Sequence, residues 1–310
     1  MGKLVYDRSP AARRTYEQAS EVVGVDLARL CFEGDEEALS ETTVTQPAVL
    51  TTSLALVEAM REKLAEVGRL WQPRLFGGHS LGLFSAAVAA EALEFRDALL
   101  LIIERARLMS GFNRDRPVGM ASIIGLESSV VEAICERATV SPQDRVDVAN
   151  LNLDTQVVIS GDVSALERAV EQARALQARV IRLKVKVSSH TALHTQQAEA
   201  FTAILCDVPL RNPSRPVVSN ISSRLLTTAD ELRGEFGAQL RSPVHWAENV
   251  RAMARHGVDT FVEAGPGHVL ARLVKRVSEG VTAVSLADAT DDPVPISVLP
   301  VRPPRPEGAR

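Results

Sequence analysis

The residues with the clearest chemical potential are the GHSLG sequence at positions 78–82. This G-x-S-x-G pattern follows a short apolar run that ends at two glycines, and a helix rich in small residues is expected to begin at Leu81. A strand-to-helix turn needs small residues beside its serine, because the backbone there is strained and crowded. Such a turn exposes the Ser80 hydroxyl and directs the Leu81 backbone N–H at an oxyanion, near a helix N-terminus. The pattern predicts a serine nucleophile, with a glycine turn and an incidental serine as the alternative.

A serine hydroxyl needs a base at neutral pH, and the chain has six histidines. His79 adjoins the serine, so in a sharp turn its side chain should point elsewhere. His190 lies in KVKVSSHTALH, at the end of an apolar strand that can deliver side chains to a site. His268 follows a Gly-Pro-Gly turn, at the late position that a conventional α/β-hydrolase uses. Spacing alone does not choose between these candidates.

Composition excludes several classes of function. Of 310 residues, 45% are hydrophobic and 24% are charged, with a net charge of −4, so neither a nucleic-acid-binding surface nor a polybasic membrane patch is indicated. Cys31, Cys135 and Cys206 are scattered, which is typical of a reducing cytosol and gives no metal-ligand spacing. The first residues lack the apolar core of a signal peptide. The longest apolar stretch, residues 81–103, carries four charged residues that a bilayer disfavours, so it is not expected to span a membrane. Together these features lead us to expect a cytoplasmic protein without a membrane or nucleic-acid partner.

The alternation of predicted strands and helices along the chain indicates an α/β fold with a parallel sheet. Helices are expected at 9–31, where Ser9 caps and Pro10 begins the helix, and at 46–66 and 95–110. Between Pro117 and Val187 the order strand, helix, two strands, helix, strand is that of a ferredoxin-like module. Its strands are expected at 120–125, 145–151, 156–160 and 180–187, and its helices at 128–138 and 163–178.

The expected domain organisation is a discontinuous body interrupted by this module. The body comprises residues 1–116 and 188–288, and the small subdomain comprises residues 117–187. Later helices are expected near 191–206, 228–240 and 246–256, with a strand at 258–263. The proline-rich residues 289–310 are expected to form a disordered tail or a docking strap.

Seven segments, in order, resemble the malonyl-CoA:acyl carrier protein transacylase family: GHSLG, IIERARLM, GMASIIG, NLNLDTQVVISG, VSSH, SPVHW and EAGPGHVL. The resemblance runs from about residue 2 to about residue 285. It implies an α/β-hydrolase-like body with a parallel sheet and an inserted ferredoxin-like subdomain. It also implies malonyl transfer from malonyl-CoA to the phosphopantetheine thiol of an acyl carrier protein, for fatty acid or polyketide synthesis. No metal or bound cofactor is implied, and we expect a monomer.

The resemblance implies a role for each matching residue. Ser80 matches the nucleophile and His190 the general base, which a backbone carbonyl from Gln239 orients in place of a carboxylate. Leu81 supplies an oxyanion N–H. Arg105 matches the arginine that binds the malonyl carboxylate, although without the family a solvated helix charge would be the preferred interpretation.

Four further residues are implied to border the substrate: Gln46, His79, Asn150 and Asn152. For the two asparagines a role in a turn remains an alternative.

The sequence departs from the family at three places. Members begin with a strand and a Gly-Gln-Gly-rich loop that supplies a second oxyanion donor, whereas this sequence begins at Met1-Gly2, after that loop. We therefore expect that the start codon is misassigned and that the natural protein is longer. Leu83-Phe84 stand where many members carry Glu-Tyr. His194 stands where methionine is common, and we expect it to perturb the pocket near His190.

Several alternatives stay open. A related acyltransferase could serve a trans-acting polyketide synthase or a malonate decarboxylase system. A general α/β-hydrolase or thioesterase would use His268 as its base and would not need Arg105. A catalytically impaired member that lacks the N-terminal oxyanion loop is a further alternative, and a non-catalytic interaction subunit would form no ester on Ser80.

Overall fold

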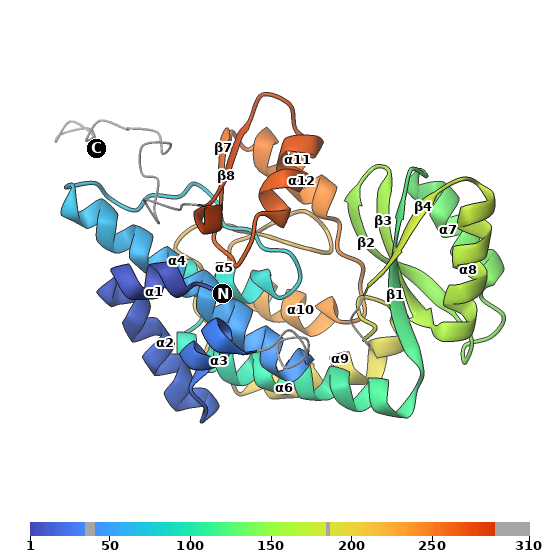
Figure 1. The fold of residues 1–310 in the computed structure, drawn as a ribbon, viewed down its shortest axis with the longest axis horizontal. Coiled ribbons are helices and arrows are strands. Elements are labelled where there is room, and N and C mark those ends of the chain that lie inside the picture. The colour runs from blue at the N-terminus through green and yellow to red at the C-terminus, as the bar shows by residue number, and fades with distance from the viewer. Residues whose placement is uncertain (35–40, 184–186, 289–310) are drawn as a thin grey trace.

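The computed structural model describes residues 1–34, 41–183 and 187–288 (Figure 1). These residues form a mixed α/β fold, with the N-terminal helices at one end of the long axis and a four-stranded sheet at the other. Within the described ranges, no helix combines the length and apolar character that a bilayer crossing requires. The expected tail, residues 289–310, lies outside the described residues.

The N-terminal end is a cluster of helices. They are α1 (Lys3–Arg8), α2 (Pro10–Val23), α3 (Leu27–Glu33) and α4 (Thr42–Glu66). Ser9 caps α2 as predicted, since its Oγ accepts a hydrogen bond from Ala12 N at 3.1 Å. The single helix predicted for residues 9–31 is wrong, because α2 ends at Gly24, whose φ of 77° is left-handed, and Asp26 caps a new helix.

Helix α4 also begins earlier than predicted. It starts at Thr42, so Pro47 lies inside the helix instead of near its start. An interior proline removes one backbone hydrogen bond, yet α4 is buried along most of its length, and tertiary packing stabilises it.

The central helices pack around the turn that contains the GHSLG sequence. They are α5 (Gly82–Ala89), α6 (Phe95–Asp115), α9 (Thr195–Cys206) and α10 (Ala229–Gln239). Phe84 of α5 stacks on Phe236 of α10, with 4.3 Å between ring centroids, and meets Phe201 of α9 edge-on at 6.1 Å. These aromatic contacts fix α5, and thereby the turn before it, against the later part of the chain.

The four-stranded sheet has the predicted order of elements. In sequence these are β1 (Val118–Ile124), α7 (Ser128–Ala138), β2 (Val146–Leu153), β3 (Gln156–Asp162), α8 (Val163–Ala175) and β4 (Arg179–Arg182). The strands pair antiparallel in the spatial order β2-β3-β1-β4, and α7 and α8 share a separate apolar core with them. The strand predicted for 180–187 is shorter, because β4 ends at Arg182, and residues 184–186 lie outside the described residues.

Parallel pairing in the rest of the described chain is sparse. The short strands are β5 (Val217–Val218), β6 (Leu225–Leu226), β7 (Thr260–Glu263) and β8 (Thr282–Ser285), with α11 (Trp246–Arg255) and α12 (Val269–Val277) beside them. Only β7 and β8 form a parallel pair among the described strands; β5 and β6 are antiparallel. A single parallel bridge joins Phe76 to Val217, so the expected parallel sheet is present here only as fragments.

One edge of the four-stranded sheet is joined to the α11 side of the molecule. Asn150 of β2 forms a parallel bridge with Val244, supported by hydrogen bonds from Leu151 N to Val244 O (2.8 Å) and from Val244 N to Ala149 O (2.9 Å). This backbone pairing fixes the position of β2 relative to the segment that precedes α11.

Candidate active site

The GHSLG sequence forms the predicted sharp turn between an extended segment and a helix. Ser80 has a left-handed φ of 52°, which is strained for a residue other than glycine. A Cβ on Gly78 would lie 2.0 Å from the Gly82 carbonyl oxygen, so position 78 requires glycine. A Cβ on Gly82 would meet nothing within 4 Å. The first glycine of the pattern is therefore sterically required, and the second is not.

A buried amide holds both sides of this turn. Asn220 Oδ1 accepts a hydrogen bond from Ser80 N at 2.8 Å, and Asn220 Nδ2 donates to the Gly78 carbonyl at 2.7 Å. Glu235 on α10 accepts from Asn220 N (2.7 Å) and from Ser219 Oγ (2.6 Å). Burial raises the pKa of the Glu235 carboxyl, and these hydrogen bonds oppose the shift.

Sequence reasoning missed Asn220 and Glu235. The available signal was a polar Ser-Asn pair directly after the apolar residues PVV, since a buried amide at a strand end needs partners. The partners lie about 140 positions earlier in the chain and could not be read from spacing.

Ser80 and His190 form the expected pair. Ser80 Oγ lies 2.7 Å from His190 Nε2, and His190 Nδ1 lies 2.9 Å from the Gln239 carbonyl oxygen. A carbonyl only accepts, so Nδ1 carries the proton and Nε2 is left as the acceptor for the serine O–H. This geometry favours His190 over His268 as the candidate base.

Arg105 points at the same serine from α6. Its Nη1 donates to Gln46 Oε1 at 2.7 Å, and its Nη2 donates to Ser80 Oγ at 3.1 Å and to Gln239 Oε1 at 3.4 Å. The side chain is 2% exposed, so the solvated helix charge considered above is wrong. Burial lowers the pKa of the guanidinium to about 10, and among the described residues no carboxylate pairs with it. A buried cation without a counter-ion is a strong site for an anionic ligand.

The same cation acts on the base. Burial first, and then the nearby Arg105 charge, lower the pKa of His190 to about 3, while the hydrogen bond to the Gln239 carbonyl opposes the shift. The imidazole is therefore neutral at pH 7 and can accept the serine proton.

The remaining expected residues lie around this cluster. Gln46 bonds Arg105, and Gln239 Nε2 donates to the Ser80 carbonyl at 3.0 Å. His79 points away from the nucleophile as expected: its Nε2 lies 2.9 Å from Asn152 Oδ1, and its ring lies 5.6 Å from that of Trp246. Asn150 is placed by its bridge to Val244 within a strand, not within a turn.

The Leu81 N–H stands at the start of α5. The N–H groups of Gly82 and Leu83 bond back to His79 and Ser80 carbonyls, whereas no residue that the structure describes accepts a hydrogen bond from Leu81 N. This donor is available to an oxyanion formed on a Ser80 adduct. Across the described ranges, no group of three His, Cys, Asp or Glu side chains is arranged to hold a metal ion.

The chain is similar to known proteins over nearly its whole length. The Acyl transferase domain family matches residues 1–291. The malonyl CoA-acyl carrier protein transacylase of Bacillus subtilis (strain 168) is 36% identical over 292 residues, covering 93% of this chain and 89% of the relative. The Escherichia coli (strain K12) protein of the same name is 36% identical over 278 residues, covering 89% and 88%.

Solved structures of similar proteins share the fold. The malonyl CoA-acyl carrier protein transacylase of Coxiella burnetii superposes with a TM-score of 0.84 at 33% identity, covering 90% of this chain and 87% of that one. A malonyl-transacylase solved with its type II polyketide synthase acyl carrier protein gives a TM-score of 0.85 at 34% identity, covering 92% and 90%.

We expect the two glycines of the turn to respond differently to substitution. Gly78→Ala forces a Cβ into the Gly82 carbonyl, which should cost about 1–3 kcal/mol of stability and slow Ser80 labelling by a neutral fluorophosphonate at least about tenfold. The matched Gly82→Ala variant should keep both properties. Urea denaturation and a time course of intact mass provide the measurements, and equal behaviour of the two variants would contradict the proposed turn geometry.

Proposed function

Because the chain belongs to the malonyl-CoA:acyl carrier protein transacylase family, we propose that it transfers a malonyl group from malonyl-CoA to the phosphopantetheine thiol of an acyl carrier protein. The transfer serves fatty acid or polyketide synthesis. The observation that carries the proposal is the cluster of Ser80, His190 and Arg105, in which one hydroxyl lies within hydrogen-bond distance of a neutral imidazole and of a buried cation.

The first half-reaction places the acyl group on the enzyme. His190 Nε2 takes the Ser80 proton as Oγ attacks the thioester carbonyl, and the Leu81 N–H donates to the resulting oxyanion. The Gln239 carbonyl stabilises the imidazolium through Nδ1–H. Collapse of the tetrahedral intermediate breaks the C–S bond, and the coenzyme A thiolate leaves with the proton from His190.

The second half-reaction reverses these roles. The carrier protein's thiol gives its proton to His190, and its sulfur attacks the Ser80 ester. The ester C–O bond breaks, and Ser80 recovers its proton from His190. Transfer in two steps through one serine is a ping-pong mechanism.

Arg105 supplies selectivity for a dicarboxylic acyl group. In the free protein its Nη2 bonds Ser80 Oγ, and the oxygens of Gln46 and Gln239 hold the guanidinium in place. A malonyl carboxylate provides the missing counter-ion and can accept two parallel hydrogen bonds. An acetyl group cannot offset the buried charge in this way.

The proposed organisation places this site between two units. Separate apolar cores and the strand order β2-β3-β1-β4 support a ferredoxin-like subdomain at 117–187, inserted into an α/β-hydrolase-like body of residues 1–116 and 188–288. The His79–Asn152 hydrogen bond and the bridge from Asn150 lie where the two units meet, which supports a role for these residues at the border of the substrate. A cytoplasmic location and a monomeric state remain predictions.

The central test is formation of the acyl-enzyme. Mixing the protein with malonyl-CoA should add one malonyl group to the intact mass, and a carrier protein bearing phosphopantetheine should then remove it. Ser80→Ala should gain no mass. A wild-type protein that gains no mass would refute the proposed function, and a malonyl group on Ser80→Ala would refute the proposed nucleophile.

Loss of Arg105 should weaken the preference for malonyl-CoA over acetyl-CoA more than it slows acyl transfer itself. Removing a charge-assisted hydrogen bond of about 1.5–3 kcal/mol should lower kcat/KM for malonyl-CoA roughly 10- to 150-fold in Arg105→Ala, with a smaller effect on acetyl-CoA. Arg107→Ala is the matched control, because Arg107 lies on the same helix and bonds Glu104 at the surface. An unchanged malonyl-to-acetyl ratio would remove Arg105 from the acyl-binding site.

We expect the pKa of His190 to lie far below that of an ordinary histidine. His190 acts when neutral, and with a pKa of about 3 it stays neutral as the pH falls from 8 to 5. Ser80 labelling by a neutral fluorophosphonate should therefore show no inflection near pH 6.5 over that range. In Arg105→Ala the repelling cation is gone, so the pKa of His190 rises and the loss of rate moves to higher pH. A wild-type inflection near pH 6.5 would contradict this electrostatic account.

A further inference from the structure

A second serine–histidine pair flanks the proposed base in the sequence. Ser188 Oγ and His194 Nε2 lie 2.6 Å apart, and both side chains are 0% exposed. Substrate cannot reach a hydroxyl buried to this extent, so Ser188 is not a second nucleophile. The hydrogen bond instead joins the two ends of residues 188–194, the loop that carries His190.

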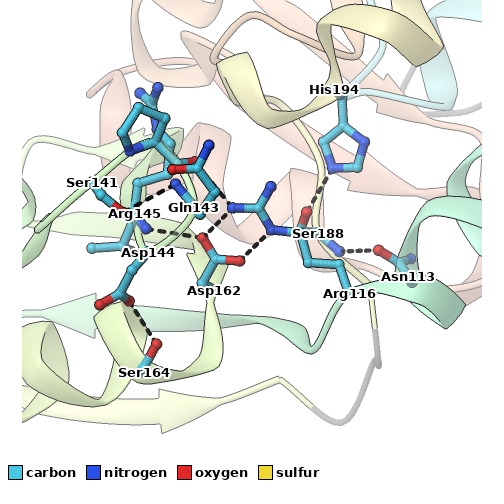
Figure 2. A network of polar contacts seen from close by, with 12 residues as sticks. Asn113, Arg116, Ser141, Gln143, Asp144, Arg145, Asp162, Ser164, Ser188 and His194 are labelled. Carbon is cyan, nitrogen blue, oxygen red and sulfur yellow. Dashed lines mark hydrogen bonds and ion pairs between the residues drawn. The ribbon is translucent and has the colours of Figure 1, made fainter.

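This loop is anchored on α6. Ser188 N donates to Asn113 Oδ1 at 3.3 Å, and the His194 ring packs against Phe112 with 4.5 Å between ring centroids. Figure 2 shows His194 bonded to the Ser188 hydroxyl and Asn113 bonded to the Ser188 backbone N. Arg105 lies about two turns earlier on the same helix, so one rigid element positions both the base loop and the carboxylate-binding arginine.

The end of α6 is itself held firmly. Arg116 donates from Nη2 to Asp162 Oδ2 at 2.7 Å, and Arg145 N donates to the same oxygen at 2.9 Å (Figure 2). Asp162 ends β3, so these bonds fix α6 to the four-stranded sheet. The loop of residues 188–194 therefore packs on α6, and the C-terminal end of α6 is bonded to the four-stranded sheet.

His190 needs this support because its backbone is strained. Its φ of 63° lies in the left-handed region, which a residue other than glycine keeps only when its surroundings hold it there. Its own N donates to Leu240 O at 2.7 Å, and Nδ1 bonds Gln239 O. These contacts fix His190 itself, and they do not hold the ends of the loop at residues 188 and 194.

We propose that Ser188 and His194 are positioning residues, whose hydrogen bond closes the loop of residues 188–194 and keeps His190 Nε2 on the Ser80 hydroxyl. The inference rests on the Ser80–His190 pair of the proposed function. We call this hydrogen bond the 188–194 clasp. It explains why a polar histidine occupies a fully buried position beside the site.

The clasp is uncharged at working pH. Burial first, and then the charges of Arg105 and Arg116, lower the pKa of His194 to about 4. Its Nδ1 has no hydrogen-bond partner among the described residues, so protonation of both ring nitrogens would create a buried cation without a counter-ion. Because the Ser188–His194 pair stays neutral, its hydrogen bond is kept over the pH range in which His190 acts as the base.

The test measures the reactivity of Ser80 in Ser188→Ala, His194→Phe, the double variant and His194→Gln. The first two should each slow labelling by a neutral fluorophosphonate roughly 10- to 100-fold, because small displacements of a base are costly. They should lower kcat for malonyl transfer with KM for malonyl-CoA within about twofold. The double variant should be no slower than the slower single variant, since the pair acts as a unit. His194→Gln, which can still bond Ser188, should recover most of the rate.

Thr52→Val is the matched control. It removes a similarly buried hydroxyl pair, Tyr16 Oη to Thr52 Oγ1 at 2.8 Å, from the N-terminal helices. It should lower the urea midpoint without changing the labelling rate.

Wild-type labelling rates in Ser188→Ala and His194→Phe would overturn the proposal, as would additive losses in the double variant. If His194→Phe fails to fold, Ser188→Ala and His194→Gln still decide the question. Labelling does not require malonyl-CoA, so a wild-type protein that labels but is not malonylated refutes the proposed function and leaves the clasp standing.

Discussion

The hydrogen bond between Ser80 Oγ and His190 Nε2 is the central contact of the candidate site. It joins two residues 110 positions apart, and both have left-handed backbones that are unfavourable on their own. The surrounding contacts compensate for this strain on each side: the Asn220 amide holds the serine turn, and the Gln239 and Leu240 carbonyls hold the histidine. The aromatic stack between α5 and α10 brings these two sets of contacts together.

A single buried cation links selectivity to basicity. In the proposed function Arg105 binds the malonyl carboxylate, and the same charge disfavours protonation of His190. The free site therefore combines a strong anion-binding position with a weak base. In the proposed mechanism, a bound carboxylate would offset the positive charge of Arg105 and make the His190 imidazole a better proton acceptor when a malonyl group is present. Binding and activation are in this way coupled through one charge.

The sequence predicted those parts of the structure that depend on local pattern. The serine turn, the cap at Ser9 and the order of elements in the four-stranded sheet each follow from residue types at fixed spacing. The helix break at Gly24 was missed, although a glycine within a predicted helix is a usable signal of a helix end. Of the predicted parallel sheet, the described residues show the β7–β8 pair and the bridge from Phe76 to Val217; strands of two to four residues carry little periodicity from which to predict pairing.

The site was predictable only in part from the residues themselves. Ser80 stood out on pattern, whereas His190 was one of several candidates, and Arg105 was singled out by resemblance to a family. Asn220 was missed because the turn that it holds lies about 140 positions earlier in the chain, and Glu235 was missed with it because Glu235 acts through Asn220. Sequence spacing records which residues are neighbours along the chain, whereas the contacts of a buried amide are set by folding.

The insertion of the four-stranded sheet between α6 and the histidine loop has a consequence for how such a protein can be re-engineered. In the proposed domain organisation, the chain leaves the body shortly after Arg105 and returns just before His190, so the two ends of the insert must keep a fixed separation. A replacement module could differ in sequence, size or binding surface, provided that it begins and ends at the same two points in space. The proposed insert is therefore constrained by the distance between its two ends more than by the residues on its surface.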